Sequence, residues 1–349
     1  MKGKEKSVRV DIKRAIIPII LAIVIIGLVS VLFFKIDMTK IVSELQEANY
    51  PLVIAAFIVY FLSAFIWSAR WRVGILATGE RVGIKELFPI VWGSMFVNNL
   101  TPLNRVGGDP IARPYLLKKR TKIKFRTGFS SVVGEQLFQI PVVLGLVAVG
   151  LSLRFLMEPS GILSIISIVA CAGIAVFLVP FFMLIFKKKG FSEKLAGFIA
   201  KILGLMRRDT DLEDITEVLE DFRKNSRKII SSRQNALKMV GLSIMLWAVD
   251  LFRIYLILTA VGITWTLPML FLVSTLPQIA GLLPLLPGGI GAVGGTFTAV
   301  LTSFNIDKEV AFGAMLIERS MSLLFSTLVG AGFLSYLGIK IWKEEGPKE

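Results

Sequence analysis

Ionisable side chains stand inside long apolar stretches of this sequence, where they could bind a ligand or hold helices together. Glu135 lies in the stretch 128–150 with no base beside it, and Glu318 and Arg319 lie near the middle of the last apolar stretch. A charge at membrane depth is costly, so it is usually paired and often functional. We expect Glu135 to need a partner on another helix, and Arg319 is the candidate. The carboxylate could form a structural ion pair, line a path for a lipid head group, or couple transport to ions.

Further polar residues occur in or beside the same apolar stretches. Asp250 and Arg253 are three positions apart, so they can neutralise each other on one helix face, which favours a structural role. The uncharged members of the set are Asn98, Asn99, Gln136, Gln139 and Gln278. These amides could line the same polar path as the charges.

An interrupted segment follows the first of these amides, with the sequence NNLTPLNRVGGDPIARPYLLKKR. Its glycine pair permits a break in the chain, and a helix that starts there offers unpaired N–H groups and a positive dipole end to an anion such as phosphate. The acid after the pair could instead cap the helix itself or pair with the arginine four positions on. The cradle would consist of Arg105, Gly107, Gly108, Asp109 and Arg113.

A second interrupted segment, LPQIAGLLPLLPGGIGAVGGTF, occupies residues 276–297. Because prolines kink helices and glycines permit unusual backbone shapes, we expect a break at Pro287, Gly288 and Gly289 and a new helix from about Ile290. Both segments combine an apolar run, a proline and a Gly-Gly pair. Paired interruptions of this kind indicate an internal repeat with a transport site between the halves, although chance similarity of two Gly/Pro breaks is the alternative.

Composition places these residues in a membrane protein. The chain has 349 residues and is 54% hydrophobic, against about 45–50% in soluble domains. The absence of histidine removes the commonest general base and metal ligand, and no phosphate-binding loop of the Walker type occurs. We therefore expect no metal, no cofactor and no ATP hydrolysis, and a transport protein rather than an enzyme. The single cysteine, Cys171, allows no disulfide within the chain.

The apolar stretches predict an all-α polytopic protein with about eight transmembrane helices plus re-entrant or broken helices, and with an inverted repeat. The predicted crossings are 15–34, 51–69, 128–150, 161–186, 236–262, 267–286, 289–304 and 308–340. Lys and Arg outnumber Asp and Glu by 40 to 25, so the formal net charge is +15. The basic residues concentrate in alternate connections between the apolar stretches, which predicts a cell-membrane protein with both termini in the cytoplasm. The segment 87–104 must then enter and leave on the cytoplasmic side.

The longest polar stretch, 187–235, interrupts the apolar pattern. Apolar residues at helical spacing and acids that precede bases predict an amphipathic helix on the cytoplasmic surface, as a lid or as a docking site for a partner. We interpret residues 1–349 as one transmembrane domain that contains this insertion.

The order of these motifs resembles a known family. Asn98-Asn99, Pro102, GGDPIAR, GEQ in the next stretch, LPGGIGAVGG and a final Glu-Arg pair are similar to the flippase-like family related to the transmembrane region of lysylphosphatidylglycerol synthase. The similarity extends over nearly the whole chain. It implies movement of lipids between leaflets, without the soluble domain that makes the aminoacylated lipid in the bifunctional synthases.

The resemblance supports a role for a defined set of positions: Asn99, Pro102, Gly107, Gly108, Arg113, Glu135, Pro287, Gly288, Gly289 and Arg319. The chain also departs from the family pattern. It has Asp109 where Glu is usual, and neutral residues at three positions that are often charged, namely Gln136, Gln139 and Gly294. If those charges bind head groups, the substrate differs from that of the bifunctional enzymes.

The sequence thus predicts a lipid flippase or translocase for a phospholipid or a polyprenyl-phosphate-linked lipid. The alternatives are a secondary transporter of a small anionic solute and a membrane-embedded transferase that acts on lipid-linked substrates. The expected partners are membrane lipids with anionic or phosphate head groups, and beyond them a synthase or a second copy of the chain. Nucleic acid is not expected, because basic residues on the cytoplasmic side explain the charge.

Overall fold

The protein is a helical membrane protein. The computed structural model describes residues 37–100, 108–157, 172–173, 197, 220, 224, 227–228, 231–281 and 290–338. Within these ranges, four helical segments are long and apolar enough to cross a membrane: Tyr50–Ala77, Phe125–Met157, Arg233–Ala260 and Lys308–Tyr336. The predicted crossing 15–34, most of 161–186 and most of the insertion 187–235 lie outside the described residues, so the total of eight crossings stays a prediction.

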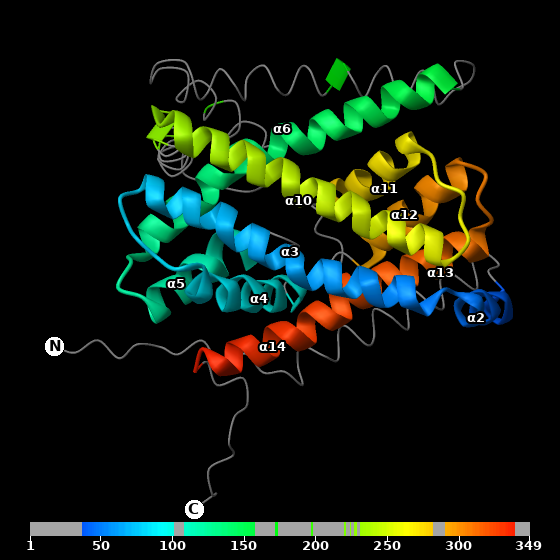
Figure 1. Ribbon diagram of the computed structural model, residues 1–349, viewed down its shortest axis with the longest axis horizontal. Helices are drawn as coiled ribbons and strands as arrows, with labels where there is room; N and C mark the ends of the chain where they lie inside the picture. Colours follow the sequence, from blue (N-terminus) through cyan, green and yellow to red (C-terminus); the bar gives the residue numbers. More distant parts are fainter. Residues whose placement is uncertain are drawn as a thin grey trace, which may run out of the picture.

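The elements follow one another along the chain as a series of long and short helices (Figure 1). They are α2 (Met38–Glu47), α3 (Tyr50–Ala77), α4 (Ile84–Leu100), the π-helical turn η1 (Gly108–Ala112), α5 (Arg113–Arg120), α6 (Phe125–Met157), α10 (Arg233–Ala260), α11 (Leu267–Ala280), α12 (Ile290–Ser303), α13 (Lys308–Arg319), the π-helical η3 (Ser320–Phe325) and α14 (Ser326–Tyr336). The residues described after the two glycine pairs are helical from Gly108 and from Ile290 onward, whereas the predicted breaks that precede them lie outside the described residues.

Helix α3 illustrates how local sequence sets these elements. Asn49 caps its start, where the side-chain oxygen accepts a hydrogen bond from Leu52 N at 3.4 Å. The chain leaves the helix through Gly79, whose φ of 94° is readily adopted only by glycine. Aliphatic side chains such as Ile54 and Ile58 are more than half exposed on its outer surface. A helix that is apolar on its outside is stable when that side faces lipid.

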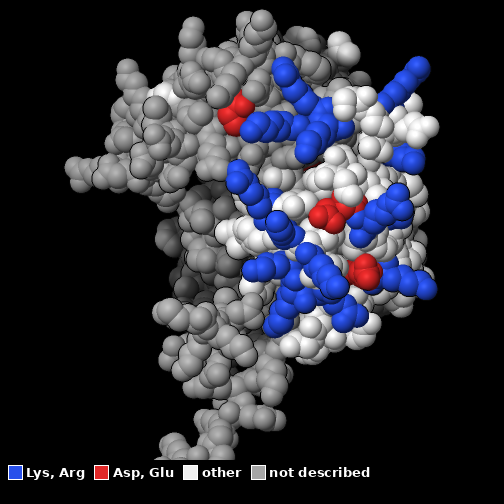
Figure 2. All heavy atoms as spheres, turned by 90° about the vertical axis from the view of Figure 1, so that its left-hand side faces the viewer, with Lys and Arg blue, Asp and Glu red and all other residues white. Residues whose placement is uncertain are grey.

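Basic residues gather at one end of the bundle, which we call the basic end (Figure 2). Exposed Lys and Arg side chains of the α3–α4 and α5–α6 connections and of the adjoining helix ends contribute to it: Arg81, Lys85, Lys118, Lys119, Arg120, Lys122, Lys124 and Arg126. Helix α14 also ends here, since the Arg120 guanidinium lies 5.8 Å from the centre of the Tyr336 ring. At the opposite end the termini of α6 and α12 meet, where Arg154 Nη2 donates to Ser303 O at 2.5 Å.

Helices α4 and α5 form a hairpin that begins and ends at the basic end. Leu87, early in α4, and Leu117, late in α5, share one buried cluster, and a Cβ on Gly93 would lie 3.3 Å from Leu116 Cδ1. Because α4 has 17 residues and is followed by the return through η1 and α5, the segment has the geometry expected of a re-entrant one.

The described helices form two repeats at a constant offset in the sequence. Helices α3 and α10 begin at Tyr50 and Arg233, α4 and α11 at Ile84 and Leu267, and α6 and α13 at Phe125 and Lys308. Each pair is 183 positions apart (233 minus 50, 267 minus 84, 308 minus 125). Such a match in three successive helices is consistent with the internal repeat that the paired interruptions predict.

The two repeats run in opposite directions through the bundle. Helices α3 and α10 are antiparallel neighbours, because Asn49 N at the start of α3 donates to Ala260 O at the end of α10. Helix α6 begins at the basic end, whereas α13 begins at the opposite end (Figure 1). The packing is also reciprocal, since α4 lies on α14 of the second repeat and α11 lies on α6 of the first. This is an inverted repeat.

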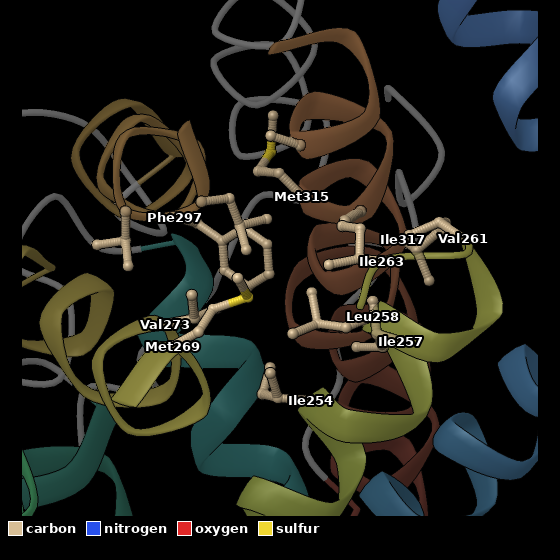
Figure 3. Close-up of a cluster of buried hydrophobic side chains, with 14 of the residues drawn as sticks. Ile254, Ile257, Leu258, Val261, Ile263, Met269, Val273, Phe297, Met315 and Ile317 are labelled. Atoms are coloured by element: carbon tan, nitrogen blue, oxygen red, sulfur yellow. The ribbon is translucent and has the colours of Figure 1, made fainter. Parts of the chain in front are cut away.

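A cluster of buried apolar side chains lies among the helices of the second repeat (Figure 3). Met269 of α11, Phe297 of α12 and Met315 of α13 converge there, next to Ile254 and Ile257 of α10. Each of these side chains is at least 95% buried. The core fixes the short helices of the second repeat against α10 and so positions the charged residues of α10 and α13.

Candidate functional site

Glu135 of α6 lies between two arginines from other helices. Arg70 of α3 approaches one carboxylate oxygen, with Nη2 at 2.5 Å and Nε at 2.7 Å from Oε1. Arg113, at the start of α5, places Nη1 2.9 Å from Oε2. All three side chains are at least 98% buried. The cluster therefore joins α3, α5 and α6 through a charged group in the basic half of the bundle.

Two tryptophans complete what we call the Glu135 cluster (Arg70, Arg113, Glu135, Trp67 and Trp71). The Arg113 guanidinium carbon lies 5.0 Å from the centre of the Trp67 ring and 5.2 Å from that of Trp71. Trp71 Nε1 donates to Ser131 Oγ on α6 at 3.0 Å, which fixes its ring. Aromatic faces stabilise a cation by about 0.5–2 kcal/mol. The rings thus hold Arg113 without using its hydrogen-bond donors.

The Glu135 cluster has donor capacity beyond its ion pairs. Arg70 Nη1 is buried and has no hydrogen-bond partner among the described residues. A buried unsatisfied donor costs about 1–3 kcal/mol, so natural proteins keep few of them. Guanidinium donors match the oxygens of carboxylate and phosphate groups. The arrangement is chemically suited to hold an oxyanion, although the same contacts also brace three helices.

Arg319 does not pair with Glu135, so that prediction was wrong. Arg319 Nε lies 2.6 Å from Oε2 of its neighbour Glu318. Because α3 and α5 both pack on α6, Arg70 and Arg113 reach Glu135 first. Arg319 belongs to the second repeat, where its ion-pair partner is Glu318.

Those partners form the Glu318 cluster (Asp250, Arg253, Glu318, Arg319 and Gln278). Arg253 Nη2 lies 2.8 Å from Asp250 Oδ1, so the predicted pair between positions 250 and 253 is confirmed. Arg253 Nη1 also approaches Glu318 Oε1 at 3.4 Å. The four charged side chains of this cluster carry two positive and two negative charges.

The Glu318 cluster also holds polar and aromatic groups. Gln278 Nε2 lies 3.4 Å from Asp250 Oδ2 and donates to Ser274 O at 3.0 Å. The Arg253 guanidinium carbon lies 5.3 Å from the centre of the Tyr60 ring. The predicted polar residues Gln278 and Arg319 are thus brought together, but away from Glu135 and Arg113.

The two clusters are related by the repeat. Arg70 and Glu135 are 65 positions apart, as are Arg253 and Glu318. The 183-position offset that relates the helices also converts one Arg–Glu pair into the other (253 minus 70, 318 minus 135). The same pair of residue types therefore occurs at equivalent positions of the two repeats.

Asn99 makes contacts that the sequence did not predict. Its side chain is turned toward α14 and η3, with Nδ2 2.7 Å from Ser326 Oγ and 3.0 Å from Thr327 Oγ1. Its neighbour Asn98 is half-buried near the end of α4.

Several predicted site residues lie partly or wholly outside the described residues. These are Arg105, Gly107, Pro287, Gly288 and Gly289 entirely, and the side chains of Asp109 and Gln136, whose backbones belong to η1 and α6. Gly108 begins η1. The proposed phosphate cradle at the first glycine pair therefore stays a prediction, apart from Arg113.

Sequence reasoning missed Arg70. Arg70 lies at the edge of an apolar stretch beside another basic residue, so its position is typical of a side chain that anchors a helix at the membrane surface. The signal that could have found it is its separation of 183 positions from Arg253, which does lie within an apolar stretch.

Comparison with known proteins agrees with this architecture. The family described as "Lysylphosphatidylglycerol synthase TM region" matches residues 17–330. The chain belongs to this family. The match spans both repeats and both charged clusters.

Two membrane proteins are similar to this chain over at least nine tenths of their own length. A UPF0104 membrane protein of Methanothermobacter thermautotrophicus is 26% identical over 91% of this chain and 96% of its own length. One from Methanocaldococcus jannaschii is 28% identical over 90% and 91%, respectively. The Haloferax volcanii protein named glycosyltransferase AglD is 25% identical over 88% of this chain, which spans 52% of that relative.

Proposed function

We propose that this protein moves a lipid between the two leaflets of the membrane, and that the Glu135 cluster contacts the lipid's phosphate group during passage. The observation that carries the proposal is the burial of two arginines and one glutamate among membrane helices, next to a hairpin that returns to the end from which it starts. Buried charge at this depth is costly to maintain, which favours a functional role.

The substrate class follows from the donors. Guanidinium groups recognise phosphate in a planar, two-pronged geometry, and Arg70 retains an unused buried donor among the described residues. Phospholipids and polyprenyl-phosphate-linked lipids both carry such a group. The name of the synthase family supports the first class, and the relative named as a glycosyltransferase supports testing the second.

Transport by this chain does not use ATP, because the sequence contains no phosphate-binding loop. Movement is then downhill, ion-coupled or driven by a partner. The basic end faces the cytoplasm in this proposal, in line with the tendency of Lys and Arg to stay on that side. The Glu135 cluster would consequently contact the lipid head group in the cytoplasmic half of its path across the membrane.

Reconstitution in liposomes tests the proposal. Vesicles with and without the purified protein carry a fluorescent phospholipid or a labelled polyprenyl-phosphate lipid, and a membrane-impermeant quencher reports the fraction exposed outside. We expect faster leaflet exchange with the protein for at least one class. Exchange equal to that of empty vesicles for every class would contradict the proposal.

A secondary transporter of a small anion is the second candidate, supported by the same buried arginines. Uptake of radiolabelled inorganic phosphate into the same vesicles separates the two. Uptake without lipid exchange would favour the transporter. Lipid exchange without uptake would favour the translocase.

A further inference from the structure

The two long helical segments that carry the buried glutamates each contain a point at which the regular α-helical hydrogen-bond pattern is interrupted. Helix α6 contains Pro141, which offers no N–H to the carbonyl of Leu137. Between α13 and α14 the chain forms the π-helical segment η3. The repeat offset pairs Pro141 with Leu324, which lies inside η3 (324 minus 141 is 183). Prolines and π-helical turns are the usual sites of helix bending.

Each departure separates a charged cluster from a helix contact of the other repeat. Glu135 precedes Pro141 in α6, and Glu318 precedes η3. Beyond these points, α6 packs on α11 of the second repeat, and α14 packs on α4 of the first. A bend at either point would therefore move a short helix of the opposite repeat relative to a charged cluster.

The packing beyond each of these points is tight enough to transmit such a movement. A Cβ on Gly330 of α14 would lie 2.5 Å from the Trp92 carbonyl oxygen of α4. A Cβ on Gly150 of α6 would lie 3.0 Å from Leu272 Cδ2 of α11. Helices in such close contact move together, because packed interfaces deform little.

Asn99 joins α4 to η3 and to the start of α14. Its Nδ2 lies 3.3 Å from Leu323 O in η3, and its closest contacts are the hydroxyls of Ser326 and Thr327 in the following turn. The Asn99 side chain is 93% buried, so water does not readily replace these bonds. One amide thus contacts polar groups on both sides of the junction between η3 and α14.

We propose that Pro141 and η3 are repeat-related hinges, and that Asn99 is a latch that holds the η3 hinge in its present geometry. Asn99 is then a positioning residue. When the latch opens, α14 and α4 tilt relative to the antiparallel α3–α10 pair. The inference concerns conformation and rests on the proposed function only for its transport measurement.

Spin-label distances test the latch in protein whose Cys171→Ser change removes the native thiol. One pair of labels joins Tyr336→Cys on α14 to Lys238→Cys on α10. The control pair joins Arg72→Cys on α3 to Lys238→Cys. We expect one dominant α14–α10 distance in otherwise unchanged protein and a second, shifted distance in Asn99→Leu and Asn99→Asp. The α3–α10 distance should stay unchanged in both. An unchanged α14–α10 distribution in both folded variants would overturn the latch.

Pro141→Ala tests the other hinge and does not depend on Asn99. The restored N–H should stiffen α6, so the distance distribution between labels at Leu156→Cys and Tyr50→Cys should narrow. A distribution as broad as that of the unchanged protein would overturn the α6 hinge.

Lipid exchange measured on the same samples separates this inference from the proposed function. Shifted distances in a protein that never exceeds empty vesicles would support the hinges and contradict lipid translocation. Unshifted distances in a protein that translocates lipid would contradict the hinges and support lipid translocation.

Discussion

At the scale of single residues, the Glu135 cluster has a structural role in addition to the functional one that we propose. A carboxylate between two buried guanidinium groups holds α3, α5 and α6 together. Breaking a buried ion pair by removing one partner is strongly destabilising, because the other charge stays buried. Loss of transport alone therefore cannot assign a role to these residues, and stability must be measured beside it.

Glu135→Gln is predicted to destabilise the protein by about 3–5 kcal/mol, since both arginines lose their counter-charge. Glu47→Gln, on the exposed face of α2, is the matched control and should change stability by less than about 0.5 kcal/mol. Thermal unfolding of the purified protein in detergent measures both. Equal melting temperatures for the two variants would show that the charge at position 135 is not buried in this network.

Combining Glu135→Gln with Arg113→Gln separates stability from function. The double variant buries less uncompensated charge than Glu135→Gln alone, so it should regain part of the lost melting temperature. It should not regain lipid exchange, because a phosphate-binding donor is missing. Recovery of both properties together would assign the cluster a purely structural role.

At the scale of elements, close contacts between helices of opposite repeats hold the bundle together. Helix α14 approaches α4 at Gly330, where a methyl group would collide with the Trp92 backbone. A Cβ added to the nearby Gly332 would have no heavy atom of the described residues within 4 Å. The two glycines thus differ in packing although they share a helix.

Gly330→Ala is expected to destabilise the protein by about 1–3 kcal/mol through overpacking. Gly332→Ala should be neutral or slightly stabilising, because alanine favours helix by up to about 1 kcal/mol. Thermal unfolding again gives the comparison. Similar melting temperatures for both variants would mean that α14 and α4 are not in close contact.

The sequence predicted elements better than it predicted pairings. Long apolar stretches located α3, α6 and α10, because the position of an apolar helix depends on local composition. The partner of Glu135 was assigned wrongly, since an ion pair between helices depends on packing that local composition does not encode. Asp250 and Arg253 were paired correctly because they share one helix face.

At the scale of the whole molecule, the inverted repeat places one Arg–Glu pair in each half of the bundle. Arg70 and Glu135 lie in the basic half, and Arg253 and Glu318 lie in the opposite half. Inverted repeats place substrate sites at the interface of the halves and allow alternating access by movement of one repeat against the other. The constant offset of helices and ion pairs is the strongest sign of this organisation.

The orientation of the molecule is directly testable. If the basic end faces the cytoplasm, Lys122→Cys should react with a membrane-impermeant maleimide only after cells are permeabilised. Glu47→Cys at the opposite end should react in intact cells. Both changes are made together with Cys171→Ser. The reverse pattern would invert the proposed topology.

The central claim is that the Glu135 cluster contacts the head group during translocation. Leaflet exchange of the preferred lipid in liposomes, compared between Arg113→Ala and the exposed control Lys118→Ala, tests it most directly. Loss of one charged donor should slow exchange about tenfold or more in Arg113→Ala. Lys118→Ala should match the unchanged protein. Exchange at the unchanged rate in a folded Arg113→Ala protein would contradict the account.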